Sequence, residues 1–230
     1  MTVHIVKETQ VIPCGTPFGI YIHTDGVLVV DISDIVQNGI TVESPAAHIL
    51  KSGDYITAVN GTTVSEKEEL QQAVAESGGE VLCLSVMRDG ESLECELRPA
   101  LNDTGNYQLG IWVRDDLAGI GTLTYVEAAG RFGALGHGIT DVDVEHLVSM
   151  QSATAYQAQI LSIIRGEKGS PGELVGQIYY NHANEIGEIT KNTRNGIFGR
   201  LEGLPDVCRK RLPWRLDSNK KSKPVRHRFW

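Results

Sequence analysis

Short apolar runs with a period of two dominate the first part of the chain, which indicates β-strands. Gly19–Ile32 alternates or runs apolar around an Asp-Gly dipeptide at 25–26, and this predicts two strands joined by a hairpin. Residues 81–87 and 92–98 flank a second Asp-Gly dipeptide and predict another hairpin. A further strand is expected over Tyr55–Val59, because an Asn-Gly turn follows it directly.

Two other segments have the capping residues and the spacing of apolar residues that are typical of helices. Ser44 and Pro45 suit an N-cap and a first helical position, so a short helix is expected over Pro45–Leu50. Apolar residues at 70, 73 and 74 recur at helical spacing after a capping box formed by Ser65 and Glu68, until two glycines end the segment. Residues 1–100 are therefore expected to form a compact, β-rich domain with two helices.

A second unit begins near Tyr107, after a polar stretch at 102–106 that predicts a linker or an exposed turn. The apolar segments of this unit are short, rich in β-branched residues and separated by glycines, which suits an antiparallel barrel. These segments cover residues 109–113, 121–126, 133–139 and 157–165.

Composition places the chain among ordinary globular proteins, with 41% hydrophobic and 22% charged residues. It contains no apolar run of about 18 residues, and residues 1–10 lack the basic-then-apolar order of a signal peptide. The chain as written is therefore expected to be soluble, without a signal or a membrane anchor.

Basic residues are distributed unevenly within the net charge of −8. Residues 208–230 contain nine of the 21 basic residues and a single acid, Asp217, so the rest of the chain is strongly acidic. A basic block such as 220–223 can bind phosphates or an anionic membrane surface, but a disordered, solvated tail is the simpler interpretation. No nucleic-acid partner is expected.

The four cysteines are far apart and form no CxxC pair or Cys/His spacing suited to zinc, so no metal and no cofactor are expected. Cys83 and Cys95 fall on neighbouring predicted strands. A disulfide between them and two small buried thiols both fit that position.

Three motifs together resemble the PDZ domains of bacterial proteases: Ser-Pro-Ala-Ala at 44–47, Gly-Asp-Tyr-Ile at 53–56 and Val-Asn-Gly at 59–61. PDZ domains bind an extended peptide as an added strand at a sheet edge, beside a helix. Gly19 suits close backbone approach because it has no Cβ, whereas Ile20 and Leu70 suit a core equally well. The resemblance implies that the peptide contacts Phe18, Gly19, Ile20, Tyr21, Ile22, Leu70 and Val74.

The second unit contains Ala-Gly-Ile-Gly-Thr-Leu-Thr at 118–124 and Phe-Gly-Ala-Leu-Gly-His-Gly-Ile-Thr-Asp at 132–141. In this order after a PDZ motif, they resemble the stage IV sporulation protein B (SpoIVB) family of serine peptidases. The resemblance implies a mainly β fold with short helices, in which a PDZ-like domain precedes a partial chymotrypsin-like, double β-barrel peptidase domain. The expected boundaries are 11–100 for the PDZ-like domain, 107–204 for the peptidase part and 205–230 for a divergent tail.

The resemblance also implies that His137 is the general base of a serine-peptidase triad. A histidine titrates near neutral pH, so it can accept a proton from a serine hydroxyl and return it to the leaving amine. The family's acid and serine lie downstream in a Gly-x-Ser-Gly-Ser-Pro context, which this chain is not expected to reach. Asp141 is a weaker candidate for orienting His137, and Ser170 is interpreted as a turn residue. The chain is therefore expected to be truncated before its nucleophile and inactive.

Two functions remain open from the sequence. The first is a sporulation-associated serine endopeptidase that recognises its substrate or another copy of itself through the PDZ domain. By resemblance, it would cleave a membrane-associated regulatory protein outside the cytoplasm, between the membranes of the developing spore, and so trigger activation of a mother-cell sigma factor. The second is a non-catalytic PDZ protein that binds peptides and is a remnant of a protease.

Overall fold

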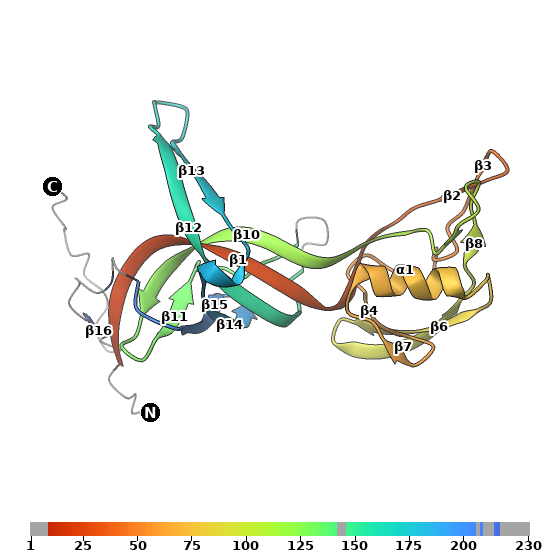
Figure 1. Cartoon of the computed structure of the whole chain (residues 1–230), viewed down its shortest axis with the longest axis horizontal. Coiled ribbons are helices and arrows are strands. Elements are labelled where there is room, and N and C mark those ends of the chain that lie inside the picture. The colour runs from red at the N-terminus through yellow and green to blue at the C-terminus, as the bar shows by residue number, and fades with distance from the viewer. Residues whose placement is uncertain (1–8, 142–145, 206–207, 209–213, 217–230) are drawn as a thin grey trace, which may run out of the picture.

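Two strands connect the two lobes of the molecule (Figure 1). The computed structural model describes residues 9–141, 146–205, 208 and 214–216. Strand β1 (Thr9–Ile32) and strand β10 (Ile111–Val126) pair antiparallel from Ile12↔Val126 to Ile32↔Ile111. They run side by side through both lobes, so no flexible linker separates the lobes at this point (Figure 1).

The predicted hairpin within residues 19–32 is wrong, because β1 continues past Asp25 and Gly26 without reversing. The pairing with β10 is irregular between His23 and Leu28, and Gly26 has φ +101° there. The local Asp-Gly signal is overridden because β10 offers hydrogen-bond partners to both halves of the strand. The dipeptide therefore marks a bulge between the lobes.

One lobe is the PDZ-like unit, with one helix over a small antiparallel sheet. The sheet continues from β1 through β4 and β6 to β7, and the hairpin predicted over 81–98 is confirmed as β6–β7. The remaining short strands form two small ribbons and a pairing at the edge of β4. The elements are β2 (Ile35–Gln37), β3 (Ile40–Val42), β4 (Tyr55–Val59), β5 (Thr62–Thr63), α1 (Lys67–Glu76), β6 (Leu82–Arg88), β7 (Glu91–Leu97), β8 (Ala100–Leu101) and β9 (Tyr107–Gln108).

Helix α1 is confirmed with its capping box one residue later than predicted. Glu66 is the N-cap, and the side chain of Glu69 accepts the backbone N–H of Glu66 at 3.2 Å. The helix expected over Pro45–Leu50 is wrong. That segment forms turns, in which only Leu50 N–H bonds a carbonyl four residues back, and a positive φ at His48 prevents regular helix there.

The other lobe is a closed barrel. Its strands pair in the cycle β1, β10, β11, β15, β14, β12 and back to β1. The sequence implied a barrel that stops midway, but β1 supplies the strand that closes it. The elements are β11 (Arg131–Ala134), β12 (Met150–Ile164), β13 (Glu173–Ile178), the 3-10 turn η1 (His182–Asn184), β14 (Glu185–Thr193), β15 (Gly196–Leu201) and β16 (Trp214–Leu216).

The two hydrophobic cores do not follow the contiguous boundaries 11–100 and 107–204. Phe18 and Ile22, from the expected PDZ segment, are fully buried in the barrel core with Leu123 and Phe132. Conversely Leu109, from the expected peptidase segment, is buried in the PDZ-like core with residues of α1. The two units therefore exchange strands.

The last described part of the chain is attached to the barrel, in contrast to the disordered tail expected from residue 205. Cys208 forms a disulfide with Cys14 of β1, and β16 pairs with β1 through Trp214↔Val11. Cys83 and Cys95 are free, half-buried thiols and form no disulfide with each other. Burial raises the pKa of Cys95 above its usual value.

We expect a fragment of residues 24–116 to fold and a fragment of residues 11–99 to fail. The first keeps every residue of the PDZ-like core, whereas the second lacks Leu109, whose burial contributes about 2 kcal/mol. The second fragment also exposes Phe18 and Ile22, which need the barrel. Thermal unfolding followed by circular dichroism distinguishes them, and equal cooperative transitions in both fragments would contradict the strand exchange.

Candidate functional site

His137 lies on the bend that follows β11. Leu135 and Gly136 both have positive φ, +68° and +118°, and this turns the chain out of the barrel sheet. His137 is exposed, and its Nδ1 is 2.9 Å from the carbonyl oxygen of Gly138. No other hydrogen bond of this ring is found among the described residues. The ring is thus positioned by backbone geometry at a surface.

The loop after His137 is held by one side chain from β14. Asn192 accepts the N–H of Ile139 at 2.8 Å and donates to the carbonyls of Ile139 at 2.8 Å and Val148 at 3.1 Å. Gly138 fits here only because it has no side chain, since a Cβ would overlap Leu147 and the Thr193 carbonyl. Asn192 therefore fixes both ends of the loop to the barrel.

His137 opens onto a cleft of about 880 Å³ between the two lobes. The lobes are joined beside it by the N–H of Ser149, which donates to the hydroxyl of Tyr55 at 3.0 Å. Burial raises the pKa of Tyr55. The PDZ-like unit contributes Lys51, Ser52, Gly53, Asp54, Tyr55, Met87, Arg88, Asp89 and Gly90, and the barrel contributes His137, Gly138, Thr140, His146, Leu147, Ser149 and Arg194.

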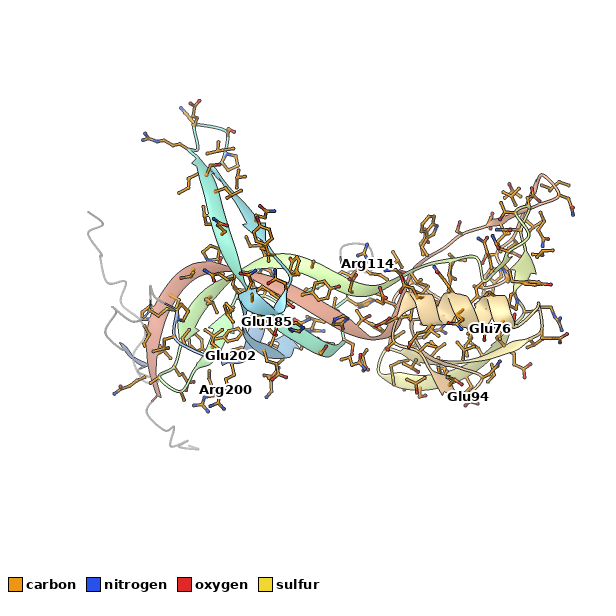
Figure 2. The ribbon with its side chains drawn as sticks, in the orientation of Figure 1. Glu76, Glu94, Arg114, Glu185, Arg200 and Glu202 are labelled. Carbon is orange, nitrogen blue, oxygen red and sulfur yellow. A yellow bond between two sulfur atoms is a disulfide. The ribbon has the colours of Figure 1, made fainter. Side chains whose placement is uncertain are left out.

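Two carboxylates, those of Asp54 in the cleft wall and Asp141 in the loop that follows His137, are paired with arginines. Asp54 is buried and accepts Arg88 Nε and Nη2, each at 2.7 Å, and the Lys51 N–H at 2.8 Å. Asp141, the weaker candidate for orienting His137, is buried and paired with Arg114 of β10 instead. Figure 2 shows Arg114 on β10 where the two lobes meet.

Serine hydroxyls are present in the cleft but are not bonded to the imidazole. Ser52 and Ser149 line the cleft, and neither is hydrogen-bonded to His137 in the described part of the chain. Ser170 lies in the turn between β12 and β13, where it exchanges two backbone hydrogen bonds with Glu167 at 2.9 and 3.0 Å. Among the described residues, no hydrogen-bonded chain of serine, histidine and carboxylate is assembled around His137.

The strand expected to receive a peptide has no free edge. Gly19 is opposite Ile120 of β10 and also opposite Tyr156 of β12, so both edges of this stretch are paired. The side chains of Phe18, Ile20 and Ile22 are buried in the barrel core. These residues close the barrel, and the expectation that they bind peptide is corrected on that ground.

Tyr21 points to the barrel surface rather than into a peptide groove. Its hydroxyl donates to the carboxylate of Asp116, and this hydrogen bond raises the pKa of Tyr21 to about 12. Its ring lies 5.3 Å from that of Tyr180 and 5.1 Å from that of His23. The tyrosine thus belongs to an aromatic cluster on the barrel.

The two helix residues expected to bind peptide do line a groove. Leu70 and Val74 are buried on α1 and face a groove of about 670 Å³, whose opposite wall is residues 106–113. At one end of the groove, Asp115 accepts the Lys67 N–H at 2.9 Å and is paired with Lys67 Nζ at 3.3 Å. This hydrogen bond raises the pKa of Lys67.

Sequence reasoning missed Asn192 and Asp115, and it assigned residues 109–113 to the second unit, whereas they line the groove beside α1. Asn192 and Asp115 act across long sequence separations, at 53 and 48 residues from their partners, so no local pattern indicates them. The described residues contain no group of histidine, cysteine and acidic side chains that could hold a metal ion.

The fold and the site together define a protein of two units, a PDZ-like unit and a β-barrel, with an exposed histidine between them. A family model for SpoIVB peptidase S55 matches residues 105–222, just over half of the chain, and one for the PDZ domain matches residues 18–98. The chain belongs to the SpoIVB peptidase S55 family, as the resemblance implied. The family match continues well past residue 204, where the sequence was expected to diverge.

Solved structures with local similarity include PDZ domains of SdrC-like proteins. The domain from Listeria monocytogenes is 22% identical, covers 40% of this chain and 90% of its own, and has a TM-score of 0.32. The domain from Listeria innocua is 24% identical, covers 39% of this chain and 94% of its own, and has a TM-score of 0.32. Within the described residues, no helix has the length and apolar character needed to span a membrane.

We expect Asn192→Ala to destabilise the protein by about 2–3 kcal/mol, because three hydrogen bonds are lost and backbone groups of Ile139 and Val148 lose their partners. Asn195→Ala is the matched control, since the side chain of that exposed asparagine makes no hydrogen bond in the described structure. Denaturant unfolding measures both. An equal loss of stability in the two variants would show that Asn192 does not anchor the loop.

Proposed function

We propose that this protein is the peptide-recognising and base-supplying part of a SpoIVB-type serine endopeptidase. The observation that carries the proposal is the position of His137, which is exposed in a cleft between the PDZ-like unit and the barrel. PDZ domains bind a peptide in an extended form. The walls of the cleft around His137 come from both units.

In this role His137 accepts the proton of a serine hydroxyl and returns it to the leaving amine. The loop held by Asn192 fixes the orientation of the ring, and the two glycines beside it leave its edge accessible. The substrate that we propose is a segment of a membrane-associated regulatory protein. Its cleavage would take place outside the cytoplasm and activate a mother-cell sigma factor during sporulation.

For the chain of residues 1–230 we propose peptide binding without turnover. In the described structure, His137 has no serine oxygen within hydrogen-bond reach, and Asp141 is held by Arg114. A functional base lies about 2.6–3.2 Å from its nucleophile, or slightly further without substrate. The same observation favours the second candidate function, a non-catalytic peptide-binding protein.

We expect no serine of this chain to react with a fluorophosphonate probe, because in the described part of the structure His137 is not hydrogen-bonded to a serine hydroxyl. Mass spectrometry of the labelled chain makes the measurement, with trypsin as the positive control. His137→Ala should leave the result unchanged. Stoichiometric labelling of a single serine that disappears in His137→Ala would contradict the proposal and would establish a complete catalytic site.

A further inference from the structure

We propose that the cleft around His137 selects peptides with acidic side chains beside the bond that faces the imidazole, and that Arg194 and Lys51 recognise these side chains. The inference rests on the proposed function and specifies the substrate class of the same cleft. Arg194 belongs to the barrel and Lys51 to the PDZ-like unit, so each unit contributes one of these cations to the lining of the cleft.

Arg194 is held beside His137 by the turn that joins β14 to β15. The hydroxyl of Thr193 accepts one backbone N–H of this turn at 3.3 Å and donates to one of its carbonyls at 2.9 Å. The turn lies against the loop that carries His137, because a Cβ on Gly138 would come within 2.6 Å of the Thr193 carbonyl oxygen. Arg194 directly follows Thr193, so its backbone is fixed next to the histidine.

Lys51 is held in the PDZ-like wall by a buried carboxylate. Asp54 accepts the Lys51 N–H at 2.8 Å, and the carbonyl of Lys51 accepts the Asp54 N–H at 3.1 Å. The side chain of Asp54 also takes two hydrogen bonds from Arg88, which neutralises its charge. The backbone that carries the Lys51 side chain is therefore fixed, and Asp54 is already paired with another cation.

The charged groups of Lys51 and Arg194 are available to a ligand. Both residues are exposed, and neither side chain makes a hydrogen bond or an ion pair within the part of the chain that the structure describes. Apart from the Arg88–Asp54 pair, the lining of the cleft has these two cations and one exposed carboxylate, that of Asp89. The chain as a whole has a net charge of −8, so the cleft is a locally positive surface on an acidic protein.

An acidic side chain is the ligand that suits these two cations. The planar guanidinium of arginine can donate two parallel hydrogen bonds to a carboxylate, and the lysine ammonium adds a point charge. Successive side chains of an extended peptide point to opposite sides. One acidic residue directed toward the barrel would thus meet Arg194, and an acidic neighbour directed toward the PDZ-like unit would meet Lys51.

The test uses the full chain and three fluorescent decapeptides that differ only at two neighbouring central residues, which are Glu-Glu, Gln-Gln or Lys-Lys. Acetylated N-termini and amidated C-termini remove the terminal charges. We expect the Glu-Glu peptide to bind about fivefold more tightly than the Gln-Gln peptide at low salt, since two exposed ion pairs form. High salt should reduce this preference, because exposed charges are screened.

Charge reversal assigns the preference to individual residues. In Arg194→Glu, the Lys-Lys peptide should bind more tightly than the Glu-Glu peptide, a reversal that a merely structural role of Arg194 would not produce. Lys51→Gln should reduce the preference for Glu-Glu about twofold. Lys191→Glu is the matched control, because this exposed residue of β14 lies outside the lining of the cleft and its substitution changes the net charge equally. This control should keep the preference, and circular dichroism verifies the fold of each variant.

The outcomes separate this inference from the proposed function. Equal affinities for the three peptides, or a preference that Arg194→Glu leaves unchanged, would keep peptide binding and overturn the role of Arg194. A reversal that also occurs in Lys191→Glu would assign the preference to net charge instead of the cleft. Absence of binding by all three peptides would overturn the inference and contradict the proposed peptide binding as well.

Discussion

The antiparallel pairing of β1 with β10 is the interaction on which the rest of the structure depends. The register runs from Ile12↔Val126 to Ile32↔Ile111 across both lobes. In the barrel lobe, this pairing lets β1 close the cycle of strands and bury Phe18 against Phe132, with ring centroids 6.0 Å apart. In the PDZ-like lobe, it brings β10 alongside α1 and completes the second core. Neither core is complete without a strand from the other part of the chain.

Because of this exchange, the groove beside α1 and the loop that follows His137 share structural support. Asp115 of β10 bonds the N-terminus of α1, and the neighbouring Arg114 pairs with Asp141 of the loop that follows His137. Asp141 is buried, so loss of Arg114 removes a cationic partner from a carboxylate in the interior, which is destabilising. The arrangement of the two lobes is therefore set by ion pairs and strand pairing at the junction.

Elements whose stability is decided locally could be predicted from the sequence. The helix at 67–76 and the hairpin around Asp89-Gly90 have their caps, turns and apolar periodicity within a few residues, and both are confirmed. The exposed position of His137 also follows from the glycines beside it. The course of residues 19–32 could not be predicted, because the Asp-Gly turn competes with a strand about 90 residues later in the chain. For the same reason the sequence did not show that Ile111, rather than Gly19, lines the groove beside α1.

Side chains along β10 alternate between its two faces, and this explains how one strand contacts three parts of the molecule. Val113 and Asp115 face the PDZ-like core and the N-terminus of α1, whereas Arg114, between them, faces the loop that follows His137. Side chains alternate between the two faces of a strand, so these contacts hold together only in one register. A shift of one residue would turn Arg114 toward α1 and away from Asp141. The register of β10 against β1 therefore fixes the wall of the groove and the position of the histidine loop at the same time.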